Sequence, residues 1–139
     1  MNSSNYSYLL LRGLIAFGGL FEAVMGVIIL FWGDSIIIFA TQMQIVPNYS
    51  LYWRTMGLLA IALGSLQIVA SYQPKRYVMV PIVACFVRFV LPVLTIIQIF
   101  EAPSMTSLLI FSTVFDFLLA AATFFLLFHN ELLWKKSSD

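Results

Sequence analysis

Charged side chains are scarce in this sequence: Asp, Glu, Lys and Arg make up only 9% of its 139 residues. A soluble domain has about 25% of such residues, so this chain lacks the material for a water-facing surface. Its seven basic and six acidic residues nearly balance, which leaves neither a basic field for nucleic acid nor an acidic tail. The shortage of charge therefore excludes an ordinary soluble domain and gives no sign of nucleic-acid binding.

Cysteine and histidine are almost absent, with one of each, Cys85 and His129. A single cysteine cannot form an intrachain disulfide, so cysteine pairing does not reveal the compartment. Metal sites usually take three or four ligands from Cys, His and carboxylates, and we expect neither a metal site nor a cofactor. The sequence also lacks a P-loop, a glycine-rich dinucleotide turn and a nucleophile elbow. These absences favour a non-enzymatic protein.

Hydrophobic residues, by contrast, make up 62% of the chain, and its mean hydropathy is +1.00. A helix needs about 20 predominantly apolar residues to cross a bilayer. Strand-like alternation is absent, and only internally hydrogen-bonded structures survive in lipid, so the apolar runs predict helices. The expected fold is all-α, a single transmembrane domain over residues 1–139 that forms an integral membrane four-helix bundle. The four predicted spans are residues 13–32, 51–71, 77–100 and 107–128.

The segment between the first two spans, residues 34–50, is apolar but too short to cross. Such a segment can lie in the membrane interface or fold back over the mouth of the bundle. We expect an interfacial or re-entrant segment there, with an ordinary connecting loop as the alternative.

The basic residues outside the spans predict the orientation of the bundle. They precede the first span, separate the second from the third, and follow the fourth, whereas loops 33–50 and 101–106 contain none. Cytoplasmic loops carry an excess of Lys and Arg, so both termini are expected to be cytoplasmic. The basic residues in question are Arg12, Lys75, Arg76, Lys135 and Lys136.

Four ionisable residues lie inside the predicted spans: Glu22, Arg54, Arg88 and Asp116. Each would cost about 2.5–3.5 kcal/mol at the centre of an isolated helix. Glu22, Arg88 and Asp116 are expected at similar depth, whereas Arg54 lies about one turn inside the outer end of its span. The four residues are therefore predicted to face the bundle interior as a polar network and candidate binding site.

Small or polar residues accompany each of the four charges at helical spacing, and on the first two helices the stripes are rich in glycine. Small side chains let helix backbones approach closely, so each of these helices is expected to turn a small and polar face inward. The two stripes are Gly18, Gly19, Glu22 and Gly26 on the first helix, and Arg54, Gly57, Ile61 and Gly64 on the second.

Three interpretations of the charges remain open at this point. Buried ion pairs can merely fix which helices pack together and in what register. They can also mark a functional pocket or an ion path. A surface that pairs with a partner subunit is the third possibility.

The first two helices resemble those of the DoxX-like small four-helix membrane proteins. The resemblance rests on Arg12-Gly13, on the run Phe17-Gly18-Gly19-Leu20-Phe21-Glu22, and on Arg54-x-x-Gly57 with Gly64 further along. It implies a bacterial or archaeal inner-membrane protein and an accessory role in membrane redox complexes. Members often carry a lysine near the place where this chain has Glu22, which is a departure from the family's pattern.

The leading functional prediction is an accessory subunit or a small-ligand or lipid-binding membrane protein with a charged midplane interior. A transporter or proton-pathway component that acts as an oligomer is one alternative, since midplane carboxylates suit proton relay. A membrane enzyme for a lipid or quinone, with Glu22 or Asp116 as acid or base, is the other. The expected partners are the lipid bilayer, a second copy or a membrane-complex subunit, and a lipid or quinone ligand.

Overall fold

The computed structural model describes residues 3–41, 47–101 and 106–132 of the chain. These residues form four helices and, within the described ranges, no strand, so the predicted all-α fold is confirmed. The helices are α1 (Ser3–Thr41), α2 (Pro47–Tyr72), α3 (Met79–Glu101) and α4 (Thr106–His129).

Three of the helices are long and apolar enough to cross a membrane, which supports the prediction of a membrane protein. Their apolar segments are Asn5–Ile36 in α1, Ser50–Tyr72 in α2 and Ile110–His129 in α4. In α3 the apolar segment found among the described residues is shorter, Met79–Val90. The whole of α3 has 23 residues, or about 35 Å at 1.5 Å per residue, and its crossing remains a prediction.

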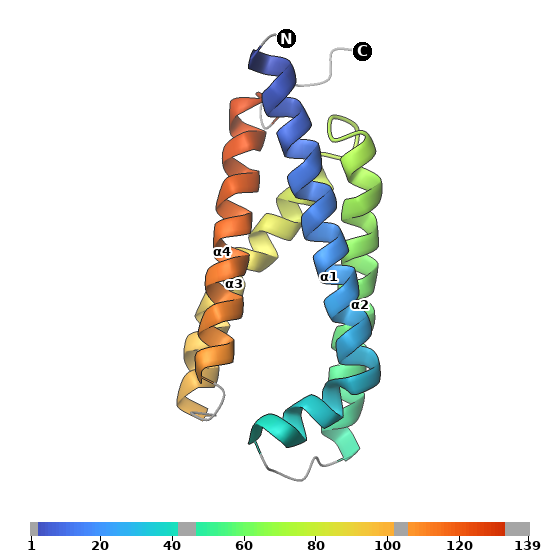
Figure 1. Cartoon of the computed structure of the whole chain (residues 1–139), viewed down its shortest axis with the longest axis vertical. Helices are drawn as coiled ribbons and strands as arrows, with labels where there is room; N and C mark the ends of the chain where they lie inside the picture. The colour runs from blue at the N-terminus through green and yellow to red at the C-terminus, as the bar shows by residue number, and fades with distance from the viewer. Residues whose placement is uncertain (1–2, 42–46, 102–105, 133–139) are drawn as a thin grey trace.

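Helix α1 is longer at both ends than the predicted span of residues 13–32. It has 39 residues, and it includes the first part of the segment predicted to be interfacial or re-entrant, residues 34–41. Gly33 does not end the helix, because a glycine within a helix costs only about 1 kcal/mol and Ile36, Ile37 and Ile38 continue the apolar run. The last part of α1 turns away from α2 and runs across the lower end of the bundle (Figure 1). Residues 42–46 of the predicted segment lie outside the described residues.

The helices are arranged as two pairs, α1 beside α2 and α3 beside α4 (Figure 1). Helix α1 begins and α4 ends at the same end of the bundle, the upper end in Figure 1. The pairs are close together at that end and farther apart towards the other.

The α1–α2 pair is held at two levels by facing glycines. A Cβ atom added to Gly19 would lie 2.6 Å from the Gly64 carbonyl oxygen, and one added to Gly26 would lie 2.6 Å from the Gly57 carbonyl oxygen. Because real Cβ atoms do not approach so closely, these four positions require glycine. The small-residue stripes of the two helices therefore pack against each other, backbone against backbone.

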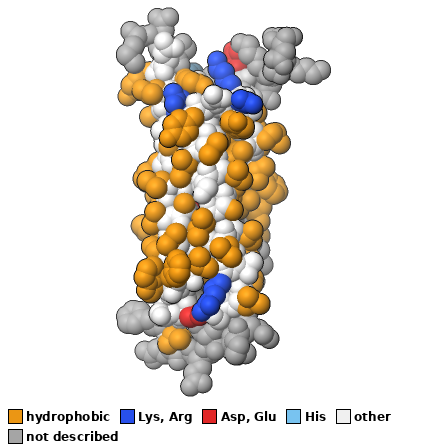
Figure 2. All heavy atoms as spheres, turned by 90° about the vertical axis from the view of Figure 1, so that its right-hand side faces the viewer, with side chains coloured by type: hydrophobic (Ala, Val, Ile, Leu, Met, Phe, Trp, Pro, Cys, Tyr) orange, Lys and Arg blue, Asp and Glu red, His pale blue; other side chains and the backbone are white. Residues whose placement is uncertain are grey.

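The hydrophobic core lies at the end of the bundle where α1 begins. Leu11 and Ile15 of α1 pack there with Leu126 and Leu127 of α4. The outer surface is also apolar: a band of hydrophobic side chains covers the middle of the face seen in Figure 2, and Lys and Arg side chains lie at its two ends. This distribution fits a body surrounded by lipid with its ends at the two interfaces.

Candidate functional site

Arg88 of α3 is the centre of a buried charged cluster. The residue is only 4% exposed. Its Nη2 atom lies 2.9 Å from Glu22 Oε2 of α1, and its Nε atom lies 3.5 Å from Asp116 Oδ1 of α4. The same Nη2 also donates a hydrogen bond to the Gly18 carbonyl oxygen at 3.2 Å. One guanidinium thus joins three helices, and we call Glu22, Arg88 and Asp116 the charged triad.

The local sequence makes room for this guanidinium. Gly18 lies one turn before Glu22, and a Cβ atom there would lie 3.1 Å from Arg88 Nη1, so the absence of a side chain leaves space for the arginine. On α3, Pro92 lies inside the helix one turn after Arg88. Proline has no N–H to bond the Arg88 carbonyl, which locally weakens the helix next to the charge.

Gln67 of α2 adds the fourth helix to the cluster. Its Nε2 atom donates a hydrogen bond to Glu22 Oε2, and the residue is 2% exposed. Charge alone did not single it out, since a glutamine is neutral. The available signal was its position among apolar residues of α2, because a buried amide needs a hydrogen-bond partner.

Arg54, the fourth predicted member of the network, lies apart from the triad. Its Nη2 atom is 3.7 Å from Asp34 Oδ2, and its side chain is 61% exposed. Ser50 Oγ donates a hydrogen bond to the same Asp34 oxygen at 2.6 Å. The structure therefore brings three of the four predicted residues together and places Arg54 in a separate pair between α1 and α2. Asp34 was missed as a partner because the sequence pattern placed it just outside the first span.

A cavity of about 750 Å³ borders the triad. All four helices contribute to its wall, and the triad together with Ser112 forms the polar part. The remaining lining residues are apolar, namely Phe21, Met25, Ile29, Met56, Leu59, Ala60, Leu63, Val87, Phe111 and Phe115.

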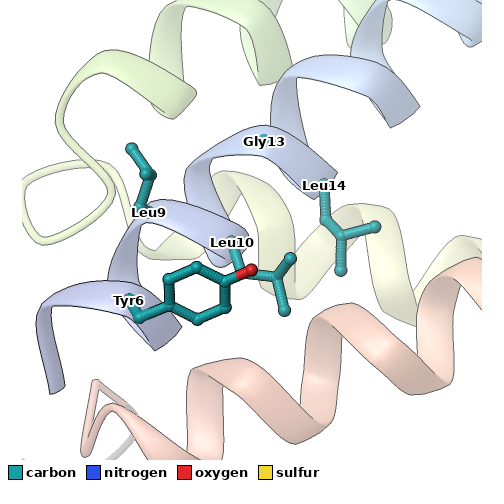
Figure 3. A pocket seen from close by; sticks show the side chains of 5 residues that line it. All are labelled: Tyr6, Leu9, Leu10, Gly13 and Leu14. Atoms are coloured by element: carbon teal, nitrogen blue, oxygen red, sulfur yellow. The ribbon is translucent and has the colours of Figure 1, made fainter. Parts of the chain in front are cut away.

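A second recess of about 290 Å³ lies on α1 alone. Figure 3 shows that its five lining residues belong to one stretch of this helix, near the beginning of α1. None of them is ionisable except the phenol of Tyr6, so the recess offers apolar surface and little chemistry. Its lining residues are Tyr6, Leu9, Leu10, Gly13 and Leu14.

The remaining candidate side chains have structural contacts. Cys85 is buried and its Sγ lies 3.6 Å from the Ala120 carbonyl oxygen of α4. The His129 ring stacks on Phe125 with the centroids 6.2 Å apart. Within the described ranges, no three His, Cys, Asp or Glu side chains form a group that could hold a metal ion.

The charged triad can therefore form hydrogen bonds or an ion pair with a molecule in the adjacent, largely apolar cavity. Comparison of the chain with family models, curated proteins and solved structures finds no match in any of the three. The resemblance to DoxX-like proteins accordingly stays a prediction from the sequence.

Proposed function

We propose that this protein binds a lipid-like small molecule in the cavity between its two helix pairs, with the polar head of that molecule at the charged triad. The observation that carries this proposal is the cavity itself, which joins a large apolar wall to a compact polar patch. Small-molecule sites commonly measure about 300–1,000 Å³ and combine an apolar lining with a few polar groups. At about 750 Å³, this cavity has the size and character of such a site.

The position of the triad supports a ligand-binding role in addition to a packing role. A pair that only fixed helix register would need no open space beside it. Here Glu22, Arg88 and Asp116 all line the cavity, and both carboxyl side chains keep about a fifth of their surface exposed. A bound molecule would thus contact the groups that hold the helices together.

The proposed setting is the inner membrane, with four spans and both termini in the cytoplasm. The supporting observation is that Arg12, Lys75 and Arg76 belong to the end where α1 begins and α4 ends, as the excess of basic residues on the cytoplasmic side predicts. In this arrangement α3 also crosses the membrane, together with α1, α2 and α4, and the last part of α1 lies along the outer interface.

Filling the cavity tests the proposed function. Ala60 lines the cavity, so an Ala60→Trp variant should exclude the ligand. Ala62, two residues further along α2, is exposed and does not line it, so Ala62→Trp is the matched control. We expect lipid-like molecules identified by mass spectrometry to copurify with the unmodified protein and with Ala62→Trp, and to be lost from Ala60→Trp. Equal retention by both variants would refute binding in this cavity.

A proton or ion pathway is the second candidate, favoured by the two carboxyl side chains that line a cavity within the spans. Flux measurements in liposomes that contain the purified protein test it. Proton flux that Asp116→Asn abolishes would support the pathway, and no flux through folded protein would eliminate it.

A further inference from the structure

We propose that the ligand of this cavity is a cationic amphiphile, an apolar chain whose head is a protonated amine. The inference rests on the proposed function and adds the chemical class of the ligand. It is carried by the charge balance of the triad and by which of its side chains are more exposed.

The charge of the cavity wall is unbalanced. Among the described residues that line it, Glu22, Arg88 and Asp116 are the only ionisable ones, so with both carboxyl groups ionised the triad has two negative charges against one positive charge. An uncompensated charge in apolar surroundings is costly. A single positive charge on the ligand would restore neutrality, whereas a carboxylate or phosphate head would increase the imbalance.

The exposure of the three side chains of the triad also favours a hydrogen-bond donor. The Arg88 side chain is 5% exposed, whereas those of Glu22 and Asp116 are 19% and 21% exposed. The arginine is turned towards the two carboxyl groups and the Gly18 carbonyl oxygen. The more exposed side chains of the triad are therefore the two that carry acceptor oxygens, and an ammonium group supplies three donors with no acceptor.

Two aromatic rings next to the triad strengthen the preference for a cation. Phe21 and Phe115 both line the cavity, and their ring centroids are 4.7 Å apart. The face of an aromatic ring attracts a nearby cation, and more strongly in a desolvated site. The same rings give no such attraction to a neutral head, so they discriminate in the same direction as the carboxyl groups.

Three ligands with the same chain and different heads test the inference directly. Dodecylamine, dodecanol and dodecanoic acid would be compared on full-length protein in phosphatidylcholine nanodiscs, by scintillation proximity with radiolabelled ligand, after subtraction of empty discs. We expect the amine to bind at least about tenfold more tightly than the alcohol, since a desolvated charge pair contributes more than the 1.4 kcal/mol that tenfold represents. The acid should bind most weakly. Equal binding of amine and alcohol, or tighter binding of the acid, would overturn the inference.

The ratio of amine affinity to alcohol affinity is the readout for variants, because partial unfolding lowers both affinities together. Asp116→Asn should reduce this ratio about tenfold, as expected when one partner of a desolvated charge pair is removed. Arg54→Gln changes a charge outside the cavity lining and should leave the ratio unaltered. A ratio that Asp116→Asn and Glu22→Gln both leave unchanged would contradict the assignment of the amine to the triad.

The Ala60→Trp variant separates this inference from the proposed function. If it abolishes the binding of all three ligands and they bind equally to the unmodified protein, the cavity is the site but the preference for an amine is wrong. If it abolishes none, both proposals fail.

Discussion

The two helix pairs are held together by different means. Helices α1 and α2 meet backbone to backbone at Gly19 with Gly64 and at Gly26 with Gly57. Helices α3 and α4 instead meet through side chains, including edge-to-face contacts of Phe89. The first pair is held by close backbone contacts at glycines, and the second is held by contacts between side chains.

This difference separates a rigid half of the molecule from an adaptable half. Glycine contacts tolerate no added atom, whereas rings and aliphatic chains can repack after a conservative change. The cavity lies between the two halves, and Arg88 of α3 joins them through its contacts with Glu22 and with the Gly18 carbonyl oxygen of α1. Four substitutions, taken from the largest expected effect to the smallest, test this contrast.

Gly64→Leu should prevent the α1–α2 pair from forming. Even the first added carbon would lie 2.5 Å from the Gly19 carbonyl oxygen and 2.6 Å from the Ala23 nitrogen, and backbone atoms cannot move aside as a side chain does. We expect a loss of stability above about 4 kcal/mol, beyond the usual range for one substitution. The measurement is the yield of folded protein after detergent extraction, with helix content and thermal unfolding followed by circular dichroism.

Gly13→Leu is the matched control, because a Cβ atom at Gly13 meets no other atom within 4 Å. The same change of residue type on α1 should leave the yield unaltered. If Gly64→Leu accumulated and unfolded like Gly13→Leu, the α1–α2 pair would not be the rigid half.

Arg88→Met should weaken the connection between the halves by about 3 kcal/mol, since removing one partner of a buried ion pair leaves the other charges unpaired. Unfolding by sodium dodecyl sulfate in mixed micelles measures this loss. The triple variant Glu22→Gln, Arg88→Met, Asp116→Asn removes all three charges and should recover most of the stability while the amine preference is lost. Full stability of Arg88→Met alone would mean that the triad does not join the pairs.

Phe89→Leu should cost about 1 kcal/mol, because it removes the aromatic contacts with Phe117 and Phe124 and keeps an apolar side chain in place. Phe86→Leu is the control on the same helix, as Phe86 is 68% exposed. In the same titration with sodium dodecyl sulfate, the unfolding midpoint should decrease for Phe89→Leu and stay unchanged for Phe86→Leu. A larger effect of Phe86→Leu would indicate that the exposed face of α3 has a partner.

Arg54→Gln should change stability least, by about 0.5 kcal/mol or less, because exposed ion pairs contribute little. The Arg54 side chain is 61% exposed and its contact with Asp34 is long, at 3.7 Å. Thermal unfolding of this variant should match that of the unmodified protein within error. A loss of stability as large as that of Arg88→Met would show that the two arginines contribute equally to stability.

Depth in the membrane allowed part of the site to be predicted from sequence. Glu22, Arg88 and Asp116 lie near the middle of their apolar runs, and the cost of burying each charge alone drives them together. Gln67 was not predicted as part of the site because its side chain has no charge. The partner of Arg54 was missed because α1 extends through Gly33 and Asp34, where turn-forming residues predicted an end.

The cavity could not be predicted, because its volume depends on how far the two helix pairs separate and no local pattern encodes that distance. The glycine stripes were visible at helical spacing in α1 and α2. Their spacing indicates a close approach but does not say which helix is the partner. That information comes only from the packed structure.

The hydrogen bond from Gln67 to Glu22 has a consequence for how the protein is made. Glu22 belongs to α1 and Gln67 belongs to α2, and synthesis proceeds from the N-terminus. The α1–α2 hairpin is therefore complete while Arg88 has yet to be synthesised. During that interval Gln67 already offers Glu22 a hydrogen-bond donor on the neighbouring helix. The first hairpin can therefore enter the bilayer with its acidic side chain hydrogen-bonded, before α3 supplies Arg88.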